Sequence, residues 1–223
     1  DAVSEMARAF GLGSPTGIEG VEEEDGNIPD PEEEIDALNN AIGQGDTLVT
    51  PLQVAQFIAA LGNGGTIYQP QIIERIGLQG EEPVFELEPI EKGTLPLSPV
   101  TLDTLKRAMI SVVENRRGTA YSVLGAYSSN ITPLAGKTGT AESVAESHAW
   151  FAGYTRRNRA DKPDIAVVVV AEFAGEGSEV AAPIFRAVVQ HYFEGRRTYL
   201  LPWESSVGVL DTSDPEAEAT PEP

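Results

Sequence analysis

Hydrophobic residues recur at two spacings along the chain, which predict a mostly helical first part and a group of strands after residue 130. In residues 50–61 they recur every three or four positions, as in a helix with one apolar side. Thr50 can cap this helix, Pro51 suits its first position, Gln53 can complete a capping box, and residues 62–65 end it. Further helices are predicted at residues 1–10, 31–41, 98–118 and 178–194, the last with Val180, Ile184, Val188 and Tyr192 on its inward side.

Three stretches after residue 130 are rich in β-branched and aromatic residues, which favour strands. They are residues 134–141, 148–154 and 165–171, and they predict an antiparallel sheet. The remaining expectations are extended segments at residues 66–76 and 84–87, a loop after residues 118–121, a turn at residues 128–130 and a basic, solvated hairpin loop at residues 156–162.

The charge of the chain changes this picture little, because most of its excess acid lies in two segments. The net charge is -20, but residues 19–36 hold ten acids and residues 211–223 hold five, with no base in either segment. The rest carries 20 acids against 15 bases, which argues against nucleic acid or an anionic membrane surface as a partner. We expect residues 19–36 to be a solvated loop and residues 211–223 to be disordered.

Cysteine and histidine are too few to suggest a metal site. The chain has no cysteine, and its two histidines, His148 and His191, lie far apart in the sequence. No apolar run reaches the ~18 residues of a membrane span. The chain begins without methionine, in a segment with the pattern of a helix already under way, and we expect it to be the downstream part of something longer.

The candidate chemistry lies in the first predicted strand, where Lys137, Thr138, Gly139 and Thr140 are consecutive. Alternation sends Lys137 and Gly139 to one face and the two threonines to the other. A ligand that touches both Lys137 and a threonine would therefore lie along the strand edge. Gly139 leaves the backbone open, and an outward N–H near Thr140 would stabilise the oxyanion that forms when an acyl group is attacked.

Two other interpretations of these residues have to be weighed. A phosphate-binding loop of the form G-x-x-x-x-G-K-[ST] is excluded, because its first glycine falls on Ile131. A surface turn of small polar residues stays open if the four residues are taken alone, since so short a motif recurs by chance.

Five short motifs stand in order along the chain: Ile42-Gly-Gln-Gly45 leading into Thr50-Pro-Leu-Gln53, Gly62-Asn-Gly-Gly65, Gly118-Thr-Ala120, Ala135-Gly-Lys-Thr-Gly-Thr-Ala-Glu142 and His148-Ala-Trp-Phe-Ala-Gly-Tyr154. Their order and spacing resemble the transpeptidase domain of penicillin-binding proteins, most closely the monofunctional, class B type. The resemblance implies an α/β fold like that of serine β-lactamases, with an antiparallel sheet of about five strands flanked by helices. This chain would be its C-terminal portion with the last three strands: residues 1–195 in the domain, 196–210 an extension and 211–223 an acidic tail.

The resemblance also implies a function and roles for particular residues. Such proteins are serine acyltransferases that cross-link the stem peptides of peptidoglycan, bind β-lactams as inhibitors and need no cofactor. Lys137 and Thr138 would be catalytic, Lys137 holding the hydroxyl of the S-x-N motif. Thr138 and Thr140 would bind the substrate's terminal carboxylate beside Gly139, and the N–H of Thr140 would be an oxyanion donor. Trp150 would line the site, although core packing is an equally good interpretation of it.

One departure from the family pattern limits these expectations. None of the four lysines has a serine three residues before it, so the S-x-x-K motif with the nucleophile is absent, and residues 128–130 spell S-x-N too close to Lys137. We therefore expect this chain to be inactive alone and to need an upstream segment, in the same protein or a second chain. The complete protein would be anchored, through a segment not present here, at the extracytoplasmic face of a bacterial membrane. A β-lactam sensor, a β-lactamase of the same fold and a catalytically silent scaffold are open alternatives.

Overall fold

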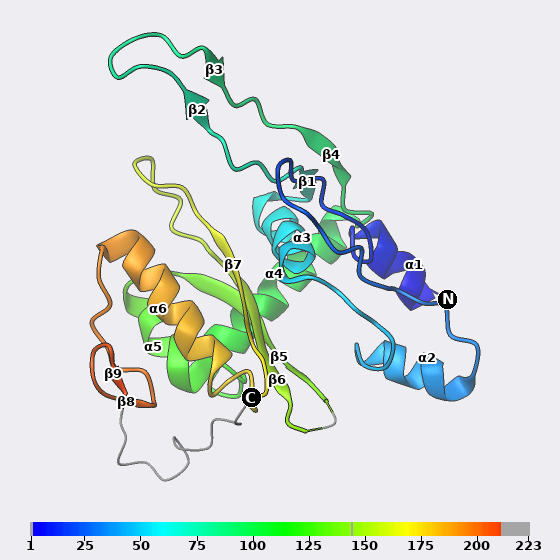
Figure 1. Ribbon diagram of the computed structural model, residues 1–223. Coiled ribbons are helices and arrows are strands. Elements are labelled where there is room, and N and C mark those ends of the chain that lie inside the picture. The colour runs from blue at the N-terminus through cyan, green and yellow to red at the C-terminus, as the bar shows by residue number, and fades with distance from the viewer. Residues whose placement is uncertain (1, 144, 211–223) are drawn as a thin grey trace. The chain divides into compact units, whose positions relative to one another are not determined.

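The computed structural model describes residues 2–143 and 145–210 (Figure 1). The disorder predicted for residues 211–223 lies outside the described residues. The chain divides into two compact units, residues 1–108 and 109–223. Among the described residues, no helix combines the length and apolar character needed to cross a membrane.

The first unit is mainly helical and carries short, separate strand pairs. Its elements are α1 (Ala2–Ala9), α2 (Glu34–Ala41), α3 (Pro51–Asn63), β1 (Thr66–Tyr68), β2 (Arg75–Ile76), β3 (Phe85–Glu86), β4 (Glu91–Thr94) and the first part of α4 (Pro99–Glu114). β1 pairs with β4 and β2 with β3, both antiparallel. The sequence predicts these elements except β4, which is exposed along its whole length and has no apolar alternation to reveal it.

Helix α3 has the caps that the sequence predicts. The Thr50 hydroxyl accepts from the Gln53 backbone N–H at 3.2 Å, Gln53 Oε1 accepts from the Thr50 N–H at 3.3 Å, and Gly64 ends the helix with a φ of 106°. Gln53 is fully buried, and its Nε2 donates to the carbonyl oxygen of Asp25 at 3.0 Å. The helix thus holds the acidic segment through a buried amide.

The acidic segment is not only solvated, because one of its carboxylates organises a turn. Glu23 accepts hydrogen bonds from the Thr16 N–H and hydroxyl at 2.8 and 2.6 Å, and from the backbone N–H groups of Gly17 and Ile18 at 2.8 and 3.1 Å. Desolvation acts to raise the pKa of Glu23, but these four donors favour the carboxylate and bring the pKa below its ordinary value.

The second unit is built on a three-stranded antiparallel sheet in the order β5-β6-β7. β5 (Leu134–Ala141) pairs with β6 (His148–Thr155), and β6 pairs with β7 (Ala166–Ala171), which confirms the three predicted strands. Helix α6 (Ala181–Glu194) covers one face, where the rings of Phe185 and Phe151 lie 4.6 Å apart. The end of α4, η1 (Tyr121–Gly125) and α5 (Ala126–Asn130) complete this core, whose largest members are Val113, Leu124, Tyr127, Leu134, Phe151, Phe185 and Val189.

Two predictions about helices in this unit are wrong. Residues 121–130 are helical, in η1 and α5, where a loop and a turn are predicted; Leu124 and Tyr127 lie on one side of this helical stretch and are fully buried. In α6 the predicted inward residue Val188 is 42% exposed, whereas Val189 is 0% exposed. The buried side is turned by one residue, because Phe185 packs on the sheet and sets the rotation of the helix.

The expected α/β fold with an antiparallel sheet and flanking helices is confirmed for the described residues. The sheet has the three strands expected of this chain, and the short pairs β1-β4, β2-β3 and β8-β9 are separate from it. The two further strands of the expected five would come from outside this chain and stay a prediction.

Residues 196–210 form an arm with β8 (Glu204–Ser206) and β9 (Val209–Leu210). Both terminal nitrogens of Arg197 donate to the Glu204 carboxylate, at 2.5 and 2.7 Å, and these bonds lower the pKa of Glu204 to about 2. Burial raises the pKa of Tyr199 to about 12, and the Arg186 guanidinium lies 4.0 Å from the centre of its ring. The Arg197–Glu204 ion pair therefore closes the arm on itself, and the stacked Arg186 attaches it to α6.

Candidate active site

Strand β5 pairs on one side only within the part of the chain that the structure describes. Its neighbour is β6, with Lys137 opposite Ala152, Thr138 opposite Phe151 and Thr140 opposite Ala149, and no strand pairs along its other edge. The predicted location of these residues, an edge strand of an antiparallel sheet, is therefore confirmed.

The register also fixes the direction of each backbone group in β5. The Arg156 N–H donates to the carbonyl oxygen of Pro133 at 2.8 Å, so the pair of residues 133 and 156 is of the hydrogen-bonded type. Because this type alternates along an antiparallel ladder without a bulge, residues 137 and 139 bond to β6. The N–H and C=O groups of Thr138 and Thr140 point away from β6, toward the outer edge, where an oxyanion donor is expected.

The side chains of β5 divide between two faces, as the sequence predicts. Thr138 lies on the face of Phe151, which α6 covers, whereas Lys137 and Gly139 lie on the other face. Trp150 is directly opposite Gly139 and only partly buried, so it shares the face of Lys137. A Cβ atom at position 139 would lie 3.1 Å from the Trp150 Cβ, so this tryptophan occupies the space that the glycine leaves.

Each polar side chain of the motif has a partner near the outer edge. Lys137 is exposed, and its Nζ donates to the outward carbonyl oxygen of Thr138 at 2.5 Å. The Thr138 hydroxyl shares a hydrogen bond of 2.7 Å with the hydroxyl of Thr119. The Thr140 hydroxyl donates to the Glu176 carboxylate at 2.8 Å. One cation and two hydroxyls thus line a single stretch of exposed backbone, which suits binding of a carboxylate and stabilisation of an oxyanion.

Sequence reasoning missed two of these partners. Thr119 belongs to the Gly118-Thr-Ala120 motif, which is noted in the sequence without a role, and the contact joins it to β5 across 19 positions of the chain. Glu176 lies in the connection between β7 and α6 and carries no motif. Only the first had a sequence signal.

A partly buried polar network fixes the beginning of β5. The Ser128 hydroxyl accepts from the Leu134 N–H at 2.9 Å and donates to Glu114 Oε1 at 2.9 Å, and Arg156 pairs with the same oxygen at 2.9 Å. Ser128 is 2% exposed, and Leu134 is 0% exposed. The residues that the sequence presents as a turn therefore act as an anchor for the strand.

Tyr154 lies near the buried end of the face that carries Lys137. It is 5% exposed, and its hydroxyl has no hydrogen-bond partner among the described residues. Burial raises its pKa above the ordinary value of a phenol, against a weaker lowering by the charge of Arg156. Tyr154 therefore stays neutral at physiological pH.

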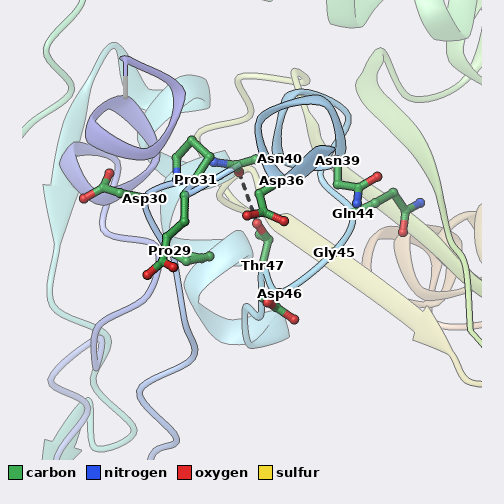
Figure 2. A pocket seen from close by; sticks show the side chains of 11 residues that line it. Pro29, Asp30, Pro31, Asp36, Asn39, Asn40, Gln44, Gly45, Asp46 and Thr47 are labelled. Carbon is green, nitrogen blue, oxygen red and sulfur yellow. Dashed lines mark hydrogen bonds between the residues drawn. The ribbon is translucent and has the colours of Figure 1, made fainter. Parts of the chain in front are cut away.

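Polar groups also gather around a hollow of about 500 Å³ in the first unit (Figure 2). It lies beside α2 and is lined by acids and amides, among them Asp30, Asp36, Asn40 and Asp46. The amide of Asn40 is occupied, since it donates to Ser4 at 2.8 Å and accepts from Thr47 at 3.2 Å. Across the described residues, no group of three or more His, Cys, Asp or Glu side chains is arranged to hold a metal ion, and we assign no metal site to this hollow.

The fold and the edge-strand site define a class of protein, and a comparison with known families agrees with it. The family described as penicillin binding protein transpeptidase domain matches residues 1–190, and the chain belongs to this family. The resemblance seen in the sequence motifs is thereby confirmed.

Among curated proteins, the chain is 33% identical to the peptidoglycan D,D-transpeptidase MrdA of Haemophilus influenzae, over 88% of this chain and 33% of that protein. It is 31% identical to the peptidoglycan D,D-transpeptidase PbpA of Mycobacterium tuberculosis, over 87% of this chain and 40% of that protein. The chain thus spans well under half of the length of these relatives.

Solved structures give the same result for the fold. A chain from a peptidoglycan synthase complex that coordinates polymerization and crosslinking matches with a TM-score of 0.71 and 32% identity, over 87% of this chain and 33% of that chain. PBPA from Mycobacterium tuberculosis matches with a TM-score of 0.69 and 26% identity, over 87% of this chain and 46% of that chain.

Proposed function

We propose that the protein containing this chain is a peptidoglycan D,D-transpeptidase and that this chain supplies the K-T-G side of its active site. The observation that carries the proposal is the one-sided pairing of β5, which places Lys137, Thr138 and Thr140 along an open strand edge. Family membership and the names of the relatives MrdA and PbpA support the same reaction.

The reaction needs a serine that this chain does not hold in an S-x-x-K motif. That serine would attack the carbonyl carbon between the two terminal D-alanines of a stem peptide and form an ester. The last D-alanine leaves with a proton, and an amine of a neighbouring strand then attacks the ester and frees the serine. Residues 1–223 alone would therefore not become acylated.

The residues of β5 would act on the substrate's polar ends. The ammonium group of Lys137 would hold the S-x-N hydroxyl and add positive potential beside the substrate. The hydroxyls of Thr138 and Thr140 would bind the terminal carboxylate. The N–H of Thr140 points away from β6 and would donate to the oxyanion that develops on the attacked carbonyl. Trp150, on the face of Lys137, would form part of the wall of the site.

Location and partners are carried over from the family in the same way. The protein would act on the outer side of a bacterial cytoplasmic membrane, held there by a segment outside this chain. Solved relatives include PBP2 of Helicobacter pylori in complex with MreC and a penicillin G acyl-enzyme of penicillin-binding protein A from M. tuberculosis. We accordingly propose an MreC-like protein as a partner and β-lactams as inhibitors.

Labelling of the complete protein with a fluorescent penicillin tests this function. We expect one covalent adduct that survives denaturation, and mass spectrometry of its peptides should place it on a serine outside residues 1–223. An adduct within these residues would show that the nucleophile is misplaced. Release of the label by rapid hydrolysis would favour a β-lactamase, and absence of labelling would favour a silent scaffold.

A further inference from the structure

We propose that Glu176 is a specificity-determining residue of the site: its carboxylate occupies the place of the substrate's carboxylate on Thr140 and has to be displaced when an anionic ligand binds. This inference rests on the proposed function. It follows from the hydrogen bond of 2.8 Å that the Thr140 hydroxyl donates to Glu176 Oε2.

The loop that carries Glu176 is hydrogen-bonded, just before this residue, to the first residue of β6 and to the residue that precedes β6. The backbone N–H groups of Ala174 and Gly175 both donate to the carbonyl oxygen of Ser147 at 3.0 Å. The N–H of Phe173 donates to His148 Nδ1 at 3.0 Å, and the two rings lie 4.7 Å apart. The loop that brings Glu176 to Thr140 is therefore held in place, and the exposed Glu176 side chain extends from it.

Gly177 shows how closely this loop lies against the strand. It is buried, and a Cβ atom there would come within 2.3 Å of the carbonyl oxygens of both Gly139 and Trp150. Only a glycine fits this position without moving the backbone. The close packing at Gly177 therefore fixes where the backbone of this loop lies along the strand.

The chemistry of a hydroxyl makes the two carboxylates competitors. Thr140 has one O–H proton to donate, and an ionised carboxylate only accepts. Donation to Glu176 and donation to the terminal carboxylate of a substrate or β-lactam are therefore mutually exclusive. The negative charge of Glu176 also repels an incoming anion at the same spot.

This arrangement predicts an effect on ligand binding rather than on the chemical step. A neutral amide at position 176 accepts a weaker hydrogen bond and carries no charge. We expect Glu176→Gln in the complete protein to lower the dissociation constant of the complex with benzylpenicillin that precedes acylation by about three- to tenfold. The acylation rate constant at saturation should change by less than about twofold, because the reacting carbonyl is not touched.

The experiment measures acylation at several concentrations of benzylpenicillin and of its methyl ester. The matched control is Glu179→Gln, which removes the same charge from the same connection three residues further on. Glu176→Asp, which keeps the charge but shortens the side chain, gives a second variant if the first does not fold. A tighter complex for the acid but not for the ester, seen with Glu176→Gln alone, supports the proposal.

Two results would overturn it while leaving the proposed function intact. They are equal dissociation constants for the Glu176→Gln and Glu179→Gln proteins, and an equal shift for the acid and the ester. If the unsubstituted complete protein is not acylated at all, the proposed function fails, and this inference fails with it.

Discussion

The two halves of strand β5 have opposite environments. Leu134 and Ala135 are 0% exposed, and a Cβ atom at Gly136 would come within 2.5 Å of the Phe151 ring. Lys137 is exposed, and residues 138–141 are partly exposed. The first half is a core strand that packs under α6, whereas the second half presents its polar groups at an edge.

The contrast shows how an edge strand can carry a rigid site. Among the described residues, β5 has one neighbouring strand along its whole length, so the position of its exposed second half depends on what holds the first half. That support comes from packing and from the network of Ser128, Glu114 and Arg156. Substitutions in the two halves should therefore affect different properties.

The largest effect is expected from Lys137→Ala, which tests the exposed second half of β5. In the complete protein it should slow acylation by penicillin about 100-fold, as removal of one preorganised electrostatic contact does. The melting temperature should hardly change, because Lys137 is an exposed residue outside the core. Lys162→Ala, which removes a lysine from the connection between β6 and β7, is the matched control. An unchanged acylation rate would reduce Lys137 to a structural lysine.

Ser128→Ala tests the buried first half of β5. It should lower the stability of the protein more than the rate of acylation. It leaves the buried Leu134 N–H without its acceptor and removes a donor from Glu114, at a cost of about 2 kcal/mol in the free energy of unfolding. Denaturant unfolding measures this cost, and Ser129→Ala, at the exposed neighbouring position, is the control. If both alanine variants unfold at the same denaturant concentration, the network does not anchor the strand.

The smallest effect is expected from Thr119→Ala, because Thr119 contacts a residue of the K-T-G motif without belonging to it. It removes the partner of the Thr138 hydroxyl and should weaken binding of a carboxylate ligand by about three- to fivefold, with little change in stability. Acylation kinetics of the complete protein would show the change in the concentration dependence. Recovery by Thr119→Ser, which keeps the hydroxyl, separates its hydrogen bond from the bulk of the side chain; without such recovery the contact has no positioning role.

Several elements of both units could be predicted from the sequence because their signals are local. The run of β-branched residues in β7 and the caps at Thr50 and Gln53 depend on neighbours a few positions away. Alternation along β5 then assigns Lys137 and Thr138 to opposite faces without any coordinates. The order and spacing of the five sequence motifs also predicted the family.

What the sequence did not reveal depends on residues far apart in the chain. Ser128 acquires its role from Glu114, 14 positions earlier, and Thr140 meets Glu176 across 36 positions. The buried side of α6 is misjudged for a related reason, since Val188 and Val189 are both apolar and only the position of Phe151 decides between them. Such choices are made by tertiary packing, which no local pattern records.

The strict pairing from residue 133 to residue 141 also limits how this strand can vary in length. Inserting or deleting one residue between Pro133 and Lys137 would turn every later side chain to the opposite face and would bury the ammonium group of Lys137 against Phe151 and Phe185. Homologues should accordingly keep this segment at constant length and accommodate gains and losses in connections such as residues 157–164, where no ladder has to be preserved.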